Sequence, residues 1–275
     1  MNLLLPETTG EALALLARHA DAIPVAGGTD LLVHWPTKGR DHDRTYVDLS
    51  RLSELKGLRW TDDELVLGGL ATYWDVITDQ RAALELPLLV RAARQVGSVQ
   101  IQARGTWAGN IVNASPAADG VPVLMAYDAV VVLESRRGRE EVPLADFYTG
   151  YKEMRRAADQ LVVAIRVPRR RHAAQLFAKI GPRRAQAIAK IGLAVTRSAA
   201  GGGWRIVAAS MAPTIRRCPA LERRLADGPA PRAPEDLLPA IEQDVTPIDD
   251  IRSTAEYRKR VMARVLFFAL PELQA

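Results

Sequence analysis

The sequence predicts a protein of the α+β class with two domains, and three observations lead to this prediction. The first stretch of about 55 residues alternates short strand patterns with helical patterns. The next segment combines a hairpin pattern, helical patterns and a Gly-rich stretch. After a basic link at residues 169–172, strand patterns of the antiparallel type precede helical ones. We therefore expect one domain over residues 1–170, with subdomains of about 1–55 and 56–170, and a C-terminal domain of a small antiparallel sheet and helices over residues 171–275.

The first subdomain begins with a helix signal. Thr8 followed by Glu11 is a capping-box pattern, and apolar residues recur behind it on one helical face. A short strand is expected at residues 23–26, directly before two glycines. A second helix, from Thr29 to about Trp35, and a second strand at residues 46–49 complete the unit.

The second subdomain is expected to contain strands, helices and one long Gly-rich segment. The predicted strands are a hairpin of residues 55–60 and 64–68, a pair of residues 130–134 and 141–144, and residues 161–165. The predicted helices cover residues 72–77, residues 88–96 and the residues around Leu124 and Met125. The Gly-rich stretch spans residues 97–119.

In the C-terminal domain the strands are expected first and the helices after them. The predicted strands are residues 176–180, 191–197 and 205–211, with a glycine turn at residues 201–203. The predicted helices are residues 220–225, 234–242 and 254–270.

Composition excludes several classes of protein and of site. The 275 residues are 48% hydrophobic and 25% charged, as in an ordinary globular protein. Cys218 is the one cysteine, so the chain can form no internal disulfide and hold no iron–sulfur cluster or Cys-based zinc site. The four histidines show no paired ligand spacing. We expect any metal centre to lie in another protein.

The N-terminus shows neither a basic region nor an apolar run typical of a signal peptide. No stretch approaches the ~20 apolar residues of a membrane-spanning helix. We therefore expect no membrane span and a cytoplasmic location.

The chain is basic, with a net charge of +5, and its arginines occur in short clusters. Such an excess is compatible with nucleic acid, an anionic ligand or an acidic protein. No aromatic residues alternate with the arginines, which favours solvated surface or a protein interface over nucleic acid. The clusters lie at residues 136–139, 166–171, 183–184, 216–217 and 223–224.

Two glycine-containing loops are the candidate ligand-binding segments. The sequence has no GxxxxGK[ST] and no GxGxxG after the first strand, so neither a P-loop nor a Rossmann fingerprint is present. The first loop, residues 25–31, is a strand-to-helix turn whose side-chain-free residues leave N–H groups to point at an anion. The alternative is a plain tight turn with Thr29 as helix N-cap.

The second loop, residues 105–110, places Thr106 and Asn110 around Gly109. Ser115 follows at short spacing, and the alternative is that it only caps a helix. Two loops of this type in one chain fit a pyrophosphate held from two sides, as a dinucleotide cofactor requires.

Several blocks along nearly the whole chain carry a family resemblance: residues 26–31, 97–98 with 105–106, 109–119, 146–151, Lys179, 249–253 and 257–258. In these blocks the chain resembles the FAD-binding medium subunit of molybdenum hydroxylases, the group of carbon monoxide, xanthine and nicotine dehydrogenases. The block Gly109-Asn110-Ile111-Val112-Asn113-Ala114-Ser115-Pro116-Ala117-Ala118-Asp119 is the most specific.

The resemblance implies a flavin fold of the p-cresol-methylhydroxylase type, with two α/β subdomains that grip FAD and a C-terminal α+β domain. It assigns cofactor contacts to residues of both loops and of the strands behind them: Val25, Ala26, Gly27, Gly28, Thr29, Asp30, Leu31, Thr106, Gly109, Asn110, Asp119, Leu161, Val162 and Lys179. Asp119 would hydrogen-bond the dinucleotide, the alternative being a helix-start carboxylate. Lys179 would approach the flavin edge, the alternative being a surface lysine beside Arg183. No catalytic residue and no metal ligand is assigned.

The chain departs from the family pattern at Trp107-Ala108, where Ile or Val followed by Gly is usual. A methyl group at residue 108 is expected to keep the backbone farther from the phosphate. Neither loop contains His or Cys, so the FAD should be bound non-covalently.

The resemblance implies an electron-transfer oxidoreductase subunit. Its partners would be a large subunit with a molybdenum cofactor and a small 2Fe-2S subunit, in a dimer of heterotrimers. FAD would pass the electrons to NAD, oxygen or a quinone. The alternatives are a freestanding FAD oxidoreductase of the same fold and a basic module that binds nucleic acid. The substrate of the molybdenum subunit is not encoded in this chain.

Overall fold

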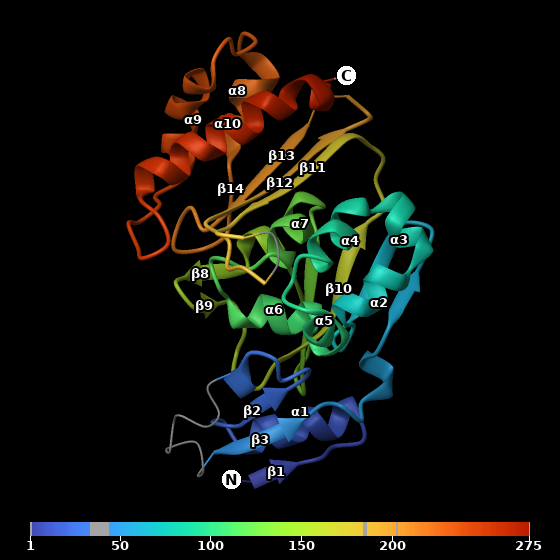
Figure 1. Cartoon of the computed structure of the whole chain (residues 1–275). Helices are drawn as coiled ribbons and strands as arrows, with labels where there is room; N and C mark the ends of the chain where they lie inside the picture. Colours follow the sequence, from blue (N-terminus) through green and yellow to red (C-terminus); the bar gives the residue numbers. More distant parts are fainter. Residues whose placement is uncertain (1, 34–43, 184–185, 202, 275) are drawn as a thin grey trace.

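The computed structural model describes residues 2–33, 44–183, 186–201 and 203–274. Three regions follow one another along the molecule, each built around its own sheet, with the two chain ends at opposite extremes (Figure 1). Three clusters of buried apolar side chains form the core. The predicted α+β class is confirmed.

The N-terminal region is a small parallel sheet with one helix packed on it. Strand order is β1-β3-β2, and the elements are β1 (Asn2–Leu4), α1 (Thr9–Arg18), β2 (Ile23–Val25) and β3 (Thr45–Asp48). The Thr8 hydroxyl accepts a hydrogen bond from the Glu11 N–H at 3.2 Å, so the predicted N-cap is present. Strand β1 has only three residues and was not predicted.

The helix predicted from Thr29 is wrong. Up to Val33, where the described residues stop, the chain forms a 3₁₀ turn, η1 (Leu31–Val33), in which the Val33 N–H donates to the Asp30 carbonyl at 3.3 Å. Thr29 therefore caps no α-helix, and Trp35 lies outside the described residues. A single 3₁₀ turn has no substantial dipole, so any ligand binding by this loop depends on individual N–H groups.

The middle region is a five-stranded antiparallel sheet with helices on one face (Figure 1). Strand order is β4-β5-β10-β6-β7, with β4 (Leu58–Trp60), β5 (Glu64–Gly68), β10 (Leu161–Pro168), β6 (Val130–Ser135) and β7 (Gly138–Pro143). Both predicted strand pairs are present. The helices are α2 (Tyr73–Thr78), α3 (Gln80–Glu85), α4 (Pro87–Ala93), α5 (Val99–Arg104), α6 (Trp107–Asn113) and α7 (Gly120–Ala126).

The Gly-rich stretch contains two short helices, α5 and α6, that its composition concealed. Thr106 is the N-cap of α6, because its hydroxyl accepts the Gly109 N–H at 3.0 Å. Trp107 is fully buried and packs against Tyr73 at a ring-centroid distance of 5.0 Å. Tertiary packing thus stabilises a helix in a segment of low helix propensity.

Three further short elements connect these parts: η3 (Ser53–Leu55), η4 (Leu144–Asp146) and the ribbon of β8 (Tyr148–Gly150) with β9 (Glu153–Met154). No helix in the described ranges is long and apolar enough to cross a bilayer.

The C-terminal region is an antiparallel sheet covered by helices on its outer face. Strand order is β11-β12-β13-β14, with β11 (His172–Ile180), β12 (Ile191–Ser198), β13 (Trp204–Ala209) and β14 (Arg216–Arg217). The covering elements are α8 (Pro219–Asp227), η5 (Pro234–Leu237), α9 (Leu238–Asp244) and α10 (Ala255–Gln274). The predicted domain boundary near residue 170 falls between β10 and β11, which belong to different sheets, and stays a prediction.

The inner face of this sheet packs on the middle region. Phe177, Ala194 and Val207 belong to the same buried cluster as α4 and α7. The Thr196 hydroxyl donates to the carbonyl of Ala126, the last residue of α7, at 2.9 Å. This apolar face with its buried hydrogen bond orients the C-terminal region.

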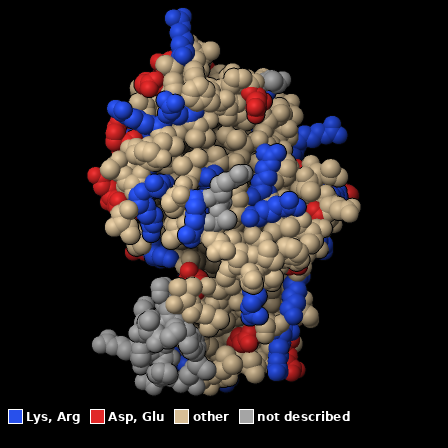
Figure 2. Space-filling view, in the orientation of Figure 1, with Lys and Arg blue, Asp and Glu red and all other residues tan. Residues whose placement is uncertain are grey.

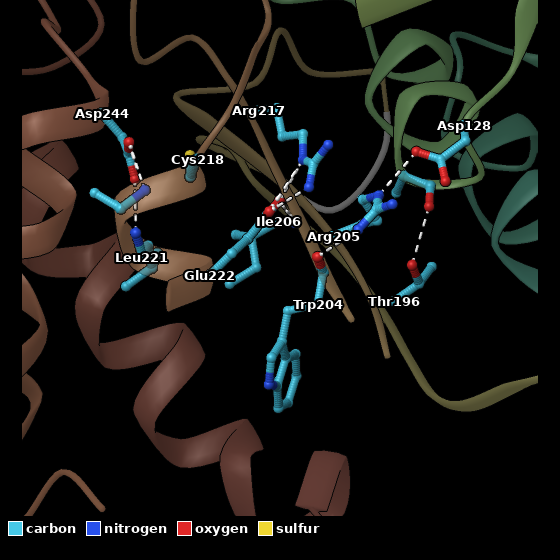
Figure 3. A network of polar contacts seen from close by, with 12 residues as sticks. Asp128, Thr196, Trp204, Arg205, Ile206, Arg217, Cys218, Leu221, Glu222 and Asp244 are labelled. Atoms are coloured by element: carbon cyan, nitrogen blue, oxygen red, sulfur yellow. Dashed lines mark hydrogen bonds and ion pairs between the residues drawn. The ribbon is translucent and has the colours of Figure 1, made fainter. Parts of the chain in front are cut away.

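Helix α8 is capped by a residue from another helix (Figure 3). Cys218 precedes its first residue and provides no side-chain cap. Instead, the buried Asp244 carboxylate of α9 accepts the N–H groups of Ala220 at 3.0 Å and Leu221 at 2.8 Å. Glu222, on the same helix, accepts the Ile206 N–H at 2.9 Å and so ties α8 to the sheet.

We predict that Asp244→Ala lowers the free energy of unfolding of the unliganded protein by about 2 kcal/mol, because it removes the cap and leaves two buried N–H groups unpaired. Urea denaturation followed by circular dichroism measures this change. The control is Gln243→Ala, an exposed neighbour on α9, which should change stability by no more than about 0.5 kcal/mol. Equal stability of the two variants would show that the Asp244 contacts contribute nothing.

Candidate functional site

A cavity of ≈ 570 Å³ lies between the N-terminal and middle regions. Its walls come from the segment after β2, from α5 and α6 with the turn between them, and from the segment that leads into β10. The volume is within the range of about 300–1,000 Å³ typical of cofactor sites. Most of the residues that the sequence analysis assigned to a cofactor line it: Ala26, Gly27, Gly28, Thr29, Asp30, Leu31, Thr106, Gly109, Asn110, Leu161 and Val162.

The first glycine loop presents free backbone donors. Gly28 has φ +71°, a left-handed conformation that turns the chain without steric cost in glycine. Within the described part of the chain, no acceptor pairs with the N–H groups of Gly27, Gly28, Thr29 or Asp30. Successive unpaired N–H groups in such a turn form a concavity suited to an anion.

The second loop meets the first directly. A Cβ built on Gly27 would lie 1.8 Å from the carbonyl oxygen of Arg104, the last residue of α5. Only glycine allows this approach. The cavity therefore has walls from two segments that are about 80 positions apart in the sequence.

Thr106 and Asn110 both line the cavity. The Thr106 hydroxyl oxygen already accepts the Gly109 N–H, so this residue mainly shapes the wall. The Oδ1 atom of Asn110 is shielded from solvent next to Gly120, and no described residue donates to it. A buried acceptor without a donor is costly.

Three of the predicted contacts lie off this cavity. Val25 lines a smaller neighbouring hollow of ≈ 270 Å³ behind the first loop. Asp119 and Lys179 are not among the lining residues. They form an ion pair with each other, with the Lys179 Nζ 2.6 Å from the Asp119 Oδ2.

This ion pair fixes three segments next to the cavity. The Lys179 Nζ, on β11, also donates to the Gln95 carbonyl at 2.8 Å, and the next residue, Val96, lines the cavity. The Lys179 side chain is only 7% exposed, so it is not a surface lysine. Asp119 precedes α7 but accepts no N–H from that helix, so it is not a capping carboxylate either. Burial raises the pKa of Asp119 to about 6, and the Lys179 ammonium opposes this shift.

Sequence reasoning missed several lining residues. Asn113, at the end of α6, donates from Nδ2 to the Asp30 Oδ1 at 3.0 Å. The Lys152 Nζ donates to the Asn113 carbonyl at 2.6 Å and to its Oδ1 at 2.9 Å. Arg156 also lines the cavity. No sequence motif pointed to Lys152 and Arg156, because both follow the family-like block of residues 146–151 rather than belong to it.

No group of three potential metal ligands occurs among the residues that the structure describes. Cys218 is fully buried, and burial raises the pKa of its thiol. The site is therefore one of backbone donors, an amide and apolar walls, which fits a dinucleotide better than a metal ion.

Comparison with known proteins identifies the two parts of the chain. Residues 1–170 match the family model described as the FAD binding domain in molybdopterin dehydrogenase. Residues 177–273 match the CO dehydrogenase flavoprotein C-terminal domain. These matches together span almost the whole chain.

Individual relatives agree with the family models. The chain is 31% identical over 258 residues to the xanthine dehydrogenase FAD-binding subunit of Escherichia coli O157:H7, covering 91% of this chain and 88% of that protein. It is 35% identical over 193 residues to the nicotinate dehydrogenase FAD-subunit of Eubacterium barkeri, covering 68% and 65%. The structure superposes with a TM-score of 0.90 on carbon monoxide dehydrogenase from Hydrogenophaga pseudoflava, at 29% identity, covering 98% of this chain and 96% of that chain.

We predict that the raised pKa of Asp119 makes the stability of the FAD-free protein depend on pH. The folded carboxyl binds its proton more tightly than the unfolded one, so folding gains stability as the pH falls through about 6. Relative to Asp119→Asn, the wild type should gain about 1.3 kcal/mol between pH 7 and pH 5. Urea denaturation at both pH values measures this gain. A difference that is constant with pH would contradict it.

Proposed function

Since the chain belongs to the family of FAD-binding medium subunits of molybdenum hydroxylases, we propose that it receives electrons from a 2Fe-2S subunit and passes them through FAD to an external acceptor. The observation that supports this proposal best is the cavity lined by the two glycine loops, with a row of N–H groups that no described residue pairs. The chain is a subunit of an oxidoreductase, as its dehydrogenase relatives are.

The residues of the cavity suit FAD. The N–H groups of Gly27 to Asp30 would hold the pyrophosphate, and Asn110 would form part of the wall beside it. Leu161 and Val162, where β10 begins, would pack against a ring of the cofactor. When bound, the flavin supplies the redox chemistry. The protein binds it, orients it and excludes water.

The proposed partners are a large molybdenum-cofactor subunit and a small 2Fe-2S subunit, in a dimer of heterotrimers located in the cytoplasm. A solved relative is described as a carbon monoxide dehydrogenase whose molybdenum cofactor lacks its Mo-pyranopterin moiety. The proposed acceptor is NAD, oxygen or a quinone.

Charge supports docking of a protein partner. Lys and Arg side chains gather across the middle of one face, whereas Asp and Glu lie mostly toward its edges (Figure 2). A positive face speeds and orients association with an acidic protein, in a salt-dependent way. Of the arginine cluster at residues 183–184, Arg184 lies outside the described residues.

We predict that the tagged chain, purified from its native host, co-purifies with two further subunits, with molybdenum and iron, and with FAD. Acid precipitation should release the FAD into the supernatant, since neither loop has a residue that could tether it. Size-exclusion chromatography, metal analysis and absorbance measure these outcomes. A lone chain that carries FAD and oxidises a small substrate by itself would instead establish the freestanding oxidoreductase. Flavin that stays in the pellet would contradict non-covalent binding.

We predict that Gly28→Val abolishes FAD binding while the protein stays folded. A β-branched side chain at φ +71° is strained, so the loop should leave this conformation and lose the arrangement of N–H groups that a phosphate needs. Gly57→Val is the matched control, because Gly57 has φ +76°, a Cβ there would meet no atom within 4 Å, and Gly57 does not line the cavity. Flavin fluorescence titration of both variants measures binding. Full FAD occupancy in a folded Gly28→Val protein would show that the loop is only a turn.

A further inference from the structure

Three charged residues line the cavity: Asp30, Lys152 and Arg156. Two of them are linked, because Asn113 hydrogen-bonds to Asp30 through its Nδ2 and to Lys152 through its two oxygens. A single amide thus brings a negative and a positive side chain close together. Arg156 is the charge that remains without an opposite neighbour in this lining.

Arg156 forms no ion pair with any residue in the described ranges. Its contacts are to carbonyls: Nη1 donates to Ala157 at 3.1 Å and to Gln160 at 2.7 Å. The nearest carboxylate in this network is Glu140, which Arg156 reaches only through the side chain of Gln160. Burial lowers the pKa of the Arg156 guanidinium. A mostly buried cation without a counter-charge is destabilising by itself.

The free part of the guanidinium is Nη2. Nε is shielded from solvent by the protein, whereas Nη1 donates to the two carbonyls. No described residue accepts from Nη2, so its N–H groups are available to a phosphate or carboxylate oxygen.

The turn that bears Arg156 is held rigidly before any ligand arrives. The Gln160 Oε1 accepts the Ala157 N–H at 2.8 Å, and the Gln160 N–H donates to the Ala157 carbonyl at 3.1 Å. The two residues after this turn, Leu161 and Val162, line the cavity. Arg156 is therefore held in place in the cavity lining, and little side-chain entropy is lost when a ligand binds.

We propose that Arg156 supplies the positive counter-charge for bound FAD. This inference rests on the proposed function, because it requires FAD in the cavity. FAD offers negative charge in two places, the pyrophosphate and the ring system after reduction. Both offer oxygen or nitrogen acceptors to the Nη2 group of Arg156. Contact with the pyrophosphate would make Arg156 a determinant of the affinity for FAD. Contact with the reduced ring would make it a determinant of the redox potential of bound FAD.

The test compares the wild type with Arg156→Leu, Arg156→Lys and the control Arg155→Leu, whose parent side chain is exposed and does not line the cavity. Fluorescence titration of the FAD-free proteins gives the Kd for oxidised FAD at low and high salt, and ADP competition tests the pyrophosphate half. We expect Arg156→Leu to bind oxidised FAD about tenfold more weakly or worse, with a reduced salt dependence. Arg156→Lys keeps the charge but loses the paired donors, so it should retain part of the affinity.

If Arg156 acts on the reduced ring instead, the Kd for oxidised FAD is unchanged and the midpoint potential falls. A tenfold weaker hold on the reduced form lowers the potential of a two-electron couple by about 30 mV. Either result supports the proposal. The ADP competition and the potential together show which part of FAD is contacted.

Unchanged Kd and unchanged potential in both Arg156 variants would overturn the inference and leave the proposed function intact. A purely structural role would lower the unfolding free energy of the FAD-free variants without changing either FAD measurement, and this also overturns it. If Arg156→Leu does not fold, Arg156→Lys decides the question. A wild-type chain that binds no FAD would overturn the proposed function and this inference together.

Discussion

The approach of Gly27 to the carbonyl of Arg104 is the constraint on which the cavity depends. A Cβ at residue 27 would stand 1.8 Å from that oxygen, so any side chain there would push the N-terminal region away from α5. The contact is reciprocal, because the Arg104 Nε donates to the Gly27 carbonyl at 3.4 Å. The two segments that line the cavity meet at this contact. The cavity therefore exists only as long as the N-terminal and middle regions remain closely packed.

The C-terminal region is held to this arrangement by a buried charge pair and by apolar packing. Lys179 on β11 joins Asp119 and the Gln95 carbonyl, next to the cavity wall. A buried ion pair adds little net stability, since removing both charges from water is costly. The pair instead fixes positions, because it joins β11 to the residue before α7 and to the segment that follows α4.

The polar groups of the cavity divide into those with a protein partner and those without one. Thr106, Asn113 and Lys152 have hydrogen-bond partners within the chain, and they hold its walls. The N–H groups of Gly27 to Asp30, the Asn110 Oδ1 and the Arg156 Nε have none among the described residues. Unpaired donors outnumber unpaired acceptors in this second group, as a ligand rich in phosphate oxygens would require. This distribution suits a chain that binds and orients a redox cofactor.

The sequence by itself determined the features that neighbouring residues encode. Thr8 and Thr72 start their helices because each hydroxyl reaches an N–H three residues away. The hairpin of β4 and β5 follows from two short strand patterns separated by a polar turn, and the specific block around Asn110 identified the family. Tertiary structure alone decided how distant groups pair. It paired Asp119 with Lys179 and placed Arg156 on the cavity wall. It also made a helix of the Gly-rich segment after Thr106 and gave the described residues after Gly28 a 3₁₀ turn in place of an α-helix. The physical reason is that capping and periodicity act within one or two turns of chain, whereas burial and charge pairing depend on which distant segments fill the same space.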